Sequence, residues 1–558
     1  ADTVSKADGG TFDGNVTMAG TLAVTGATTL TGGVSGNTTF SNNVTITGDL
    51  ASSTSGTSNF RAGVNAGNSI ASGGNFNTVV GDEAGTALTT GDDNTAFGYG
   101  ALYSEDAHGK NTAVGTNSLL TLNAGADGYN TAVGYFSGRL ITTGIRNTLI
   151  GSSSGVSLTS GNYNTALGYI ALDADTQGQS SVAIGYGSLT SQNFISATDA
   201  YNVAVGLNAG NQVTTGISNT IVGGLAGDAL TDADHNVAVG QSALSADTKG
   251  SKNTAVGHSA LEAQNFTSST SSYNTAIGSD AGKAISTGIQ NVIIGSNAGD
   301  ALTDADFNVA IGYNVLSADT KGSRSVAIGR SALGSQNFSS ATDTNNTAVG
   351  FGTGSSVTTG TSNTLIGNSA GDTIQSGNNN ICLGSGSDVN HDTSNGIAIG
   401  VNISATDNDF SFGKASNVVT NDFDTDANFS RSSDERLKKN ITNQTLGLDF
   451  INDLRTVKYN WKPSHELDST DSQLAHLYKE KEADNEMNTT ATMHNFIAQE
   501  VKAALDKAGV SDFSGWKEDQ YGVQQVSREM FIIPLVKAMQ ELSAKNDALE
   551  ARIKTLEG

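Results

Sequence analysis

A five-residue unit recurs along residues 77–400 and constrains the fold more than any other feature of the sequence. It consists of Asn, then Thr or Val, a small residue, an apolar residue and Gly, as in Asn94–Gly98 and Asn111–Gly115. Nineteen closing glycines follow one another from Gly81 to Gly400 at a nearly constant spacing. The step from Gly98 to Gly115 has the commonest length. A fixed period of this length is typical of a solenoid, in which each repeat forms one coil.

The repeat also has a longer period, because every fourth step of the array is lengthened. Gly134, Gly206, Gly278 and Gly350 stand at equivalent places in this super-repeat, and the step from Gly185 to Gly206 is one of the long ones. The four extra residues include an aromatic side chain in each long step, namely Phe194, Phe266 and Phe338. Two hypotheses follow for these phenylalanines: they protrude and contact a receptor, or they pack on neighbouring coils.

Each unit is predicted to form one short strand, with a second, less regular strand before the next Asn. Alternation places the second and fourth residues on one face and the third residue, usually Ala, on the other. Both faces are apolar, which indicates that both are covered. We predict that one face fills the coil and that the alanine face meets another chain. The Asn side chains of successive coils are predicted to form an amide ladder.

This unit resembles the head repeats of trimeric autotransporter adhesins, whose Asn-Ser-Val-Ala-Ile-Gly units build a left-handed parallel β-roll trimer. Ser181–Gly185 and Ser325–Gly329 carry the resemblance most closely. The resemblance implies a parallel β-roll rod for residues 71–400. It is specific for fold and not for function.

Residues 1–70 follow a different pattern. Apolar residues recur every six positions, as at Phe12, Met18, Val24 and Leu30, with turn residues between them. Since so polar an alternation cannot bury a core within one chain, we predict an intertwined triple-stranded β shaft. A flexible Gly/Thr linker is the alternative.

The composition changes near residue 432. Gly is frequent before this position, whereas both Pro and both Trp residues lie after it. Apolar periodicity predicts helices over 446–454 and 496–508, with a strand over 457–461 between them. We therefore interpret residues 401–432 as a connector and residues 433–558 as a separate domain.

The last segment of the chain carries a heptad seam. The seam consists of Leu535, Met539, Leu542, Asn546, Leu549, Ile553 and Leu556. This spacing predicts a coiled coil, and Asn546 at a core position sets its register at some cost in stability. The predicted fold class is therefore mostly β: a trimeric β shaft and a parallel β-roll solenoid, followed by a small α+β domain that ends in a trimeric coiled coil.

Four motifs stand in order in the C-terminal domain: Ser433–Ile441, Val457–Trp461, Phe496–Val501 and Ile533–Ala538 before the coiled coil. Together they resemble the intramolecular chaperone domain of endosialidase-type tailspikes. That family caps phage tail fibres and tailspikes, assists their trimerisation and releases itself by serine-dependent self-cleavage. The resemblance implies a chaperone and autopeptidase domain at residues 433–558.

The same resemblance implies a catalytic pair. In the family, a Ser five residues before a Lys forms the dyad, which here gives Ser433 and Lys438. Ser433 would attack the carbonyl of Ser432 and break the bond between residues 432 and 433. Lys438 can act as the base only when deprotonated, which burial or a cationic neighbour such as Arg436 or Lys439 favours.

Spacing alone leaves another interpretation of this motif open. Ser433 and Asp434 also fit a helix cap before a basic turn. If the dyad is active, it is expected to act once on its own chain, with no external substrate.

Composition argues against several classes of function. The net charge is −25 without a basic patch, so no nucleic-acid partner is expected. The single Cys382 cannot form an intrachain disulfide or a thiolate metal cage. The seven His residues show no ligand spacing, and neither a metal nor another cofactor is predicted. No apolar run long enough to span a membrane and no signal-peptide pattern occurs, so membrane insertion is not expected.

One acidic motif recurs at the longer period, around Asp232 and Asp234 and again around Asp304 and Asp306. A Ca²⁺ site between coils and a solvated turn are the two interpretations. The turn is favoured because the calcium-binding nonapeptide of other β-rolls is absent from the sequence.

The sequence therefore predicts a homotrimeric phage tail fibre, located in the virion after synthesis in the host cytoplasm. Its expected partners are other tail or baseplate proteins at the N-terminal end and a host-surface receptor, either a glycan or an outer-membrane component. Three parallel chains fold slowly in register, and a C-terminal domain that trimerises first raises the effective concentration of their strands. The alternatives are a bacterial trimeric surface adhesin and a tail-borne glycan depolymerase. No convergent pair of carboxylates supports the depolymerase.

Overall fold

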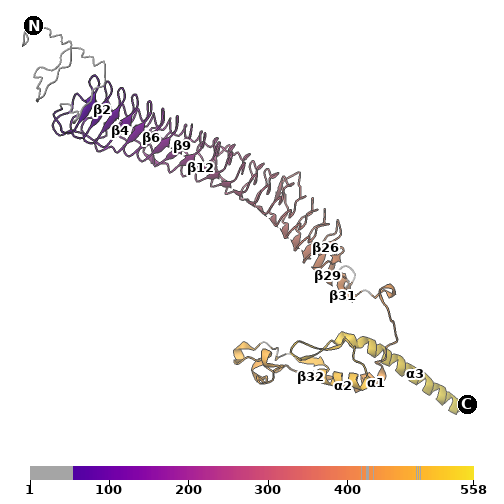
Figure 1. Cartoon of the computed structure of the whole chain (residues 1–558). Coiled ribbons are helices and arrows are strands. Elements are labelled where there is room, and N and C mark those ends of the chain that lie inside the picture. Colours follow the sequence, from indigo (N-terminus) through magenta and orange to yellow (C-terminus); the bar gives the residue numbers. More distant parts are fainter. Residues whose placement is uncertain are drawn as a thin grey trace, which may run out of the picture. The chain divides into compact units, whose positions relative to one another are not determined.

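The computed structural model describes residues 54–415, 417–422, 426–431, 433–485, 487, 489, 490 and 492–558. The chain divides into two compact units, residues 1–432 and 433–558. Figure 1 shows the first as a stack of coils and the second as a smaller unit that contains α1, α2 and α3. The predicted shaft falls outside the described residues except for residues 54–70, and Ser432 also lies outside them.

The first unit is a parallel β-solenoid, in which each coil adds one short strand to a single continuous sheet. Successive strands pair in register, so that Val203, Ala204 and Val205 lie opposite Thr220, Ile221 and Val222. The strands of this parallel stack are β1 (Phe60–Ala62), β2 (Thr78–Val80), β3 (Thr95–Phe97), β4 (Thr112–Val114), β5 (Thr131–Val133), β6 (Thr148–Ile150), β7 (Thr165–Leu167), β9 (Val182–Ile184), β11 (Val203–Val205), β12 (Thr220–Val222), β13 (Val237–Val239), β15 (Thr254–Val256), β17 (Thr275–Ile277), β18 (Val292–Ile294), β19 (Val309–Ile311), β21 (Val326–Ile328), β23 (Thr347–Val349), β24 (Thr364–Ile366), β25 (Ile381–Leu383), β27 (Ile397–Val401) and β29 (Asp409–Lys414). The mostly β solenoid predicted from the repeat is confirmed.

The glycine that closes each unit is required by the close stacking of the coils. Gly240 has a φ of 138°, and a Cβ at this position would lie 2.3 Å from the carbonyl oxygen of Gly257 in the next coil. The same geometry recurs at the other closing glycines. A side chain would both strain the backbone and clash with it, which explains why Gly persists along the array.

The predicted amide ladder is confirmed and is tied to the backbone on both sides. Oδ1 of Asn219 accepts a hydrogen bond from the backbone N–H of Asn236 at 3.0 Å. Nδ2 of Asn219 donates to the backbone carbonyl of Ala233 at 2.8 Å and to Oδ1 of Asn202 at 3.2 Å. Since these side chains are buried, the bonds satisfy backbone groups that would otherwise be unpaired at the corner of the coil.

The two strand faces are the reverse of those expected. The third residue of each unit points into the coil and is fully buried, as at Ala96 and Ala113. Leucine and isoleucine side chains from the turns, such as Leu88, fill the remaining interior, so only a small residue is usually needed here. The fourth residue points outward and is partly exposed in the single chain, with the highest values at Phe97, 54 %, and Leu167, 44 %. The prediction that the alanine face meets another chain is therefore wrong.

We call the surface formed by the second and fourth residues of each unit the outward face. From β2 to β25 the second residue is Thr, Val or Ile, and the fourth is Val, Ile, Leu or Phe. The outward face is therefore uncharged along this whole stretch.

The solenoid extends beyond the predicted limits of residues 71 and 400. β1 forms an earlier coil, in which Arg61 takes the place of the inward alanine and so obscures the repeat. β29 forms a later coil, whose closing Gly413 follows Gly400 after a shorter step than the other coils take. Beyond it, β30 (Asn417–Asp422) and β31 (Asp426–Arg431) run antiparallel. Much of the predicted connector at 401–432 thus belongs to the sheet.

The long coils bury the phenylalanines among their extra residues. Phe194, Phe266 and Phe338 are between 6 % and 8 % exposed. Short strand pairs accompany these coils and the end of the array, namely β8 (Gly178–Gln179) with β10 (Thr198–Asp199), β14 (Gly250–Ser251) with β16 (Thr270–Ser271), β20 (Gly322–Ser323) with β22 (Thr342–Asp343), and β26 (Asp388–Val389) with β28 (Ser404–Ala405). The receptor-contact hypothesis for the phenylalanines is wrong, and they pack within the solenoid.

The recurrent acidic turn joins adjacent coils. Oδ1 of Asp234 accepts a hydrogen bond from the backbone N–H of Ile217 at 2.8 Å, and Asp306 does the same with Ile289. These bonds give the repeated acids a role as turn residues, which is the favoured interpretation from the sequence.

The second unit is a small α+β domain. Its elements are η1 (Glu435–Leu437), α1 (Leu448–Asp453), β32 (Val457–Tyr459), η2 (Ser464–Glu466), η3 (Ala475–Leu477), η4 (Glu482–Asp484), β33 (Met493–Asn495), α2 (Ala498–Ala508), β34 (Trp516–Glu518), β35 (Gln524–Val526), η5 (Arg528–Phe531) and α3 (Ile532–Glu557). Two antiparallel pairs, β32 with β33 and β34 with β35, accompany a core that includes Phe450, Val501 and Phe531. The helices and the strand predicted here are confirmed, although α1 and α2 each begin two residues later than expected.

Candidate functional site

The structure brings Ser433 and Lys438 together at the start of the second unit. Lys438 Nζ donates a hydrogen bond to Ser433 Oγ at 2.7 Å. The short helix η1 lies between them, and the backbone N–H of Lys438 donates to the carbonyl of Glu435 at 2.9 Å. This tight turn brings the side chains of Ser433 and Lys438 into contact.

The helix-cap interpretation of this segment also holds, but the cap is Asp434. Its carboxylate accepts a hydrogen bond from the backbone N–H of Arg436 at 2.9 Å. Because Asp434 satisfies the turn, the hydroxyl of Ser433 is left to contact Lys438. Capping and pairing are therefore compatible, and neighbouring residues perform them.

Arg436 is held by Asp434 in a forked ion pair. Its Nε and Nη2 lie 3.0 Å and 2.6 Å from the carboxylate oxygens. These hydrogen bonds from Arg436 are the main reason that the pKa of Asp434 lies below its usual range. The charge of Arg436 is thus offset beside the pair.

Ser433 and Lys438 are both exposed in the single chain. A lysine amine is a good base only when its neutral form is favoured, and burial is one way to favour it. The second unit alone brings the two groups into contact but leaves Lys438 exposed. The carbonyl that would be attacked belongs to Ser432, outside the described residues.

The predicted seam of α3 is a row of exposed apolar side chains. Its hydrophobic members are Leu535, Met539, Leu542, Leu549, Ile553 and Leu556, each between 49 % and 85 % exposed. Asn546 is exposed in the same row and donates from Nδ2 to Glu550 Oε1 at 3.1 Å. The helix is confirmed, and the coiled coil stays a prediction.

Glu541 is a positioning residue that the sequence did not reveal. Its Oε2 accepts a hydrogen bond from the backbone N–H of Leu448 at 2.7 Å and so caps α1 from α3. This bond is the main cause of the lowered pKa of Glu541, with Lys537 Nζ 3.3 Å from its other oxygen. Since 93 residues separate Glu541 from Leu448, no local pattern could have indicated the contact.

Residues 433–510 match the model of the family described as chaperone of endosialidase. No curated protein and no solved structure matches the chain. In the part of the chain that the structure describes, no helix has the length and apolar character needed to cross a membrane. The family match begins at Ser433, the first residue of the second unit, and ends just beyond α2. The chain therefore joins a long parallel β-solenoid to a C-terminal chaperone domain of the endosialidase type, the architecture of a tail-fibre or tailspike-like protein.

Proposed function

We propose that three copies of this chain form a phage tail fibre that binds the host surface, and that the C-terminal domain assembles the trimer before releasing itself. The observation that carries the proposal is the endosialidase-type chaperone domain after a solenoid whose outward face is uncharged and consists of Thr and apolar residues. A chaperone attached to its own client acts on that client alone, at a fixed and high effective concentration.

The outward face supports association with identical chains. Apolar residues such as Ile366 and Ile277 are about two-fifths exposed there, at 43 % and 39 %. Burying the open part of such a side chain contributes on the order of 1 kcal/mol, repeated on each coil. A second and third copy present the same residues at the same height, so three stripes can meet around one axis.

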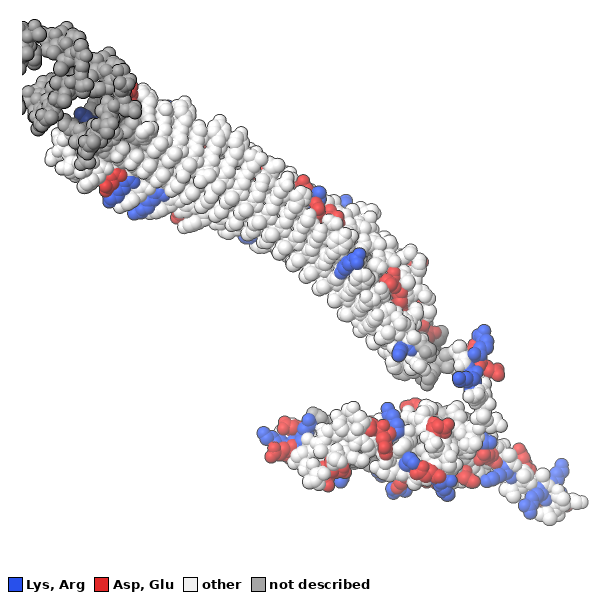
Figure 2. All heavy atoms as spheres, in the orientation of Figure 1, with Lys and Arg blue, Asp and Glu red and all other residues white. Residues whose placement is uncertain are grey.

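The second unit supports the same stoichiometry at the other end of the chain. The seam of α3 is open along its length, and a heptad seam is buried by pairing with equivalent helices. Figure 2 shows charged side chains densely on the second unit and sparsely on the viewed face of the solenoid. We infer that α3 pairs first and brings the outward faces into register.

Self-release would follow from the contact between Ser433 and Lys438. Neutral Lys438 Nζ takes the proton of Ser433 Oγ, which attacks the carbonyl carbon of Ser432. The peptide C–N bond breaks, the proton passes to the departing nitrogen of Ser433, and an ester links residue 432 to Oγ. Water then hydrolyses the ester, leaving a carboxylate on Ser432 and a free hydroxyl on Ser433. Burial of Lys438 in the assembled trimer would favour its neutral form, so assembly would precede cleavage.

Denaturing electrophoresis with intact-mass measurement tests the release. The wild-type chain is expected to yield a fragment of residues 433–558, whereas Ser433→Ala and Lys438→Ala remain full length. Lys439→Ala is the matched control, because it removes an adjacent lysine and should leave cleavage intact. Full-length wild-type chains under conditions that permit assembly would contradict self-release, and a fragment from Ser433→Ala would contradict the assigned nucleophile.

A further inference from the structure

One coil of the solenoid differs from its three counterparts around a buried carboxylate. A fully buried acid lies ten residues before Gly115, Gly185, Gly257 and Gly329, at Glu105, Asp175, Asp247 and Asp319. Each of these glycines precedes a lengthened step of the array, and the step after Gly115 is the shortest of the four. In three coils the acid is Asp, followed by Thr and, two residues later, Gly. The coil of Glu105 is the first of these four and is called the first coil below. Its same four positions are Glu105, Asp106, Ala107 and His108. Three side chains able to bind a metal replace Asp, Thr and Gly.

The three aspartates are satisfied by protein groups. Asp175 accepts a hydrogen bond from Gln192 Nε2 at 2.6 Å and others from backbone N–H groups, including that of Gly178 at 2.9 Å. Gln264 and Gln336 donate to the other two aspartates in the same way. These coils show what a buried carboxylate needs at this place in the fold: an amide side chain and several backbone donors.

The glycine in these coils shows where a side chain at its position would point. A Cβ built on Gly178 would lie 2.1 Å from Asp175 Oδ2, and the equivalent distance at Gly250 is 2.0 Å from Asp247 Oδ2. A side chain at this position is therefore directed at the carboxylate. In the first coil this position is His108.

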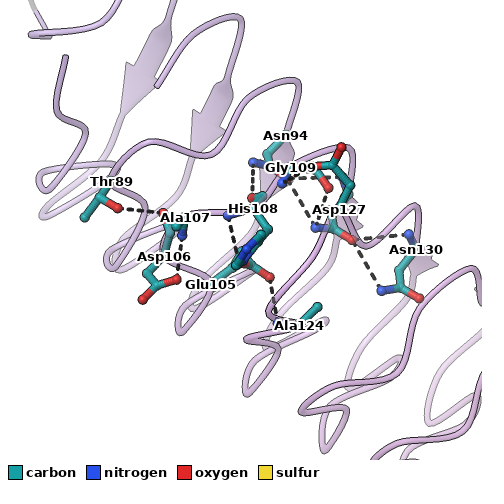
Figure 3. A network of polar contacts seen from close by, with 11 residues as sticks. Thr89, Asn94, Glu105, Asp106, Ala107, His108, Gly109, Ala124, Asp127 and Asn130 are labelled. Atoms are coloured by element: carbon teal, nitrogen blue, oxygen red, sulfur yellow. Dashed lines mark hydrogen bonds and ion pairs between the residues drawn. The ribbon is translucent and has the colours of Figure 1, made fainter. Parts of the chain in front are cut away.

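The first coil has lost the amide donor. Leu122 stands where the other coils have Gln, and Glu105 accepts longer backbone hydrogen bonds, from His108 at 3.2 Å and Ala124 at 3.4 Å. The imidazole Nδ1 of His108 lies 3.5 Å from Glu105 Oε1 (Figure 3). That nitrogen is buried and has no hydrogen-bond partner among the described residues. A buried carboxylate and an imidazole nitrogen that makes no hydrogen bond to any described residue thus face each other.

We propose that Glu105, Asp106 and His108 bind one divalent transition-metal ion of the zinc type. Their ligand atoms lie within 4.8 Å of one another. Two ligand atoms on a tetrahedral Zn²⁺ ion are about 3.4 Å apart, because each bond is about 2.1 Å long. The 3.5 Å between His108 Nδ1 and Glu105 Oε1 fits this spacing.

The donor set selects the class of ion. One imidazole nitrogen with two carboxylates suits Zn²⁺ and its transition-metal neighbours, whereas Ca²⁺ and Mg²⁺ prefer all-oxygen sites. The fourth position is open to water. The positive charge of the ion would offset the buried carboxylate and so replace the missing Gln.

The backbone of the site is held by the preceding coil. The carbonyl of Asp106 accepts hydrogen bonds from the N–H of Thr89 at 2.6 Å and from its hydroxyl at 2.9 Å. The carbonyl of His108 accepts one from Asn94 Nδ2 at 3.2 Å (Figure 3). The ligands therefore sit on a turn fixed before any ion arrives, which lowers the cost of binding. The ion would stabilise the turn and its contact with Ala124.

Titration of the tag-free full-length chain with Co²⁺, followed by visible absorption and competition with Zn²⁺, tests this site. We expect one bound Co²⁺ per chain, displaced by Zn²⁺, and at least tenfold weaker binding in His108→Gly. His258→Ala is the control and should bind as the wild type does. The combined variant Glu105→Asp, Asp106→Thr, His108→Gly and Leu122→Gln copies a counterpart coil and should fold with no Co²⁺ band. Absence of a band in the wild type, or an undiminished band in either the His108 variant or the combined variant, would overturn the proposal.

Discussion

The two units of this chain stabilise their backbones over very different sequence distances. In the solenoid, backbone hydrogen bonds run from one coil to the next, as from Thr148 N–H to the carbonyl of Asn164 at 2.9 Å. In the second unit, α1, α2 and α3 close their hydrogen bonds within a turn of helix. Local contacts form faster than distant ones, so α3, whose backbone hydrogen bonds are all local, is suited to form first, before distant contacts such as Glu541 with Leu448 close the rest of the unit.

Both units leave apolar side chains exposed in the single chain. The outward face offers modest burial on many coils, whereas the seam of α3 is concentrated on one helix. A uniform stripe fixes the register between neighbouring chains only weakly, because a shift of one chain by one coil places similar residues opposite each other. A heptad seam with Asn546 in its core specifies one register. In the proposed trimer, the second unit would therefore choose the register and the solenoid would form the lasting contact.

The largest effect is expected from placing charges on the outward face. In the double variant Ile294→Lys and Ile311→Lys, assembly would bury two lysines per chain, at a cost on the order of several kcal/mol. We expect loss of the trimer by sedimentation velocity, with the β-sheet circular dichroism retained because both side chains point outward. Asp304→Lys on an exposed turn is the control. An intact trimer in the double variant would exclude the outward face as the interface.

A smaller effect distinguishes two adjacent glycines within a coil. Gly223 has a φ of 139°, and a Cβ there would lie 2.4 Å from the carbonyl oxygen of Gly240, whereas a Cβ on Gly224 would have no neighbour within 4 Å. Gly223→Ala should lower the free energy of unfolding by at least about 2 kcal/mol. Gly224→Ala should change it by less than about 0.5 kcal/mol. Denaturant unfolding measures both, and equal losses would contradict the stacking argument.

The smallest effect concerns pH. Burial raises the pKa of Asp388 to about 6, and the nearby Asp372 carboxyl adds to the shift. The protonated form is therefore favoured in the folded chain, so its contribution to stability is present below about pH 4 and is lost as the pH rises through about 6. Asp388→Asn should gain on the order of 1 kcal/mol relative to wild type between pH 5 and pH 8, measured by thermal unfolding. A constant difference across this range would exclude the titration of Asp388 as its cause.

Much of the solenoid could be predicted because each coil repeats the same physical requirement. A glycine is needed where coils approach closely, and an asparagine is needed where the corner exposes backbone groups, so both recur visibly. The end coils escaped because Arg61 and the short step to Gly413 break that pattern. The outer coils of an array have one neighbour instead of two, which relaxes the requirement.

The orientation of the strands could not be read from the sequence, since both faces are apolar. The decisive fact is how much interior the turn residues fill, and side chains such as Leu88 and Leu158 are fully buried there beside the alanines. The sequence also left open whether Phe194 protrudes or packs, because its burial depends on the neighbouring coil.

The candidate sites show the same division between local and distant information. The pair of Ser433 and Lys438 depends on one turn, so its spacing was a usable signal. The contact from Glu541 to Leu448 spans the domain and left no signal. The cluster at Glu105 to His108 did leave one: it departs from the longer repeat of the array, and a comparison of the four coils position by position would have found it.

The central claim is that the second unit drives three chains together on the outward face. Its most direct test is the native mass of the uncleavable full-length variant Ser433→Ala beside a chain that ends at residue 432. The account predicts three chain masses for Ser433→Ala, and monomers or aggregates for the truncated chain. A monomeric Ser433→Ala variant, or a soluble trimer from the truncated chain alone, would contradict it.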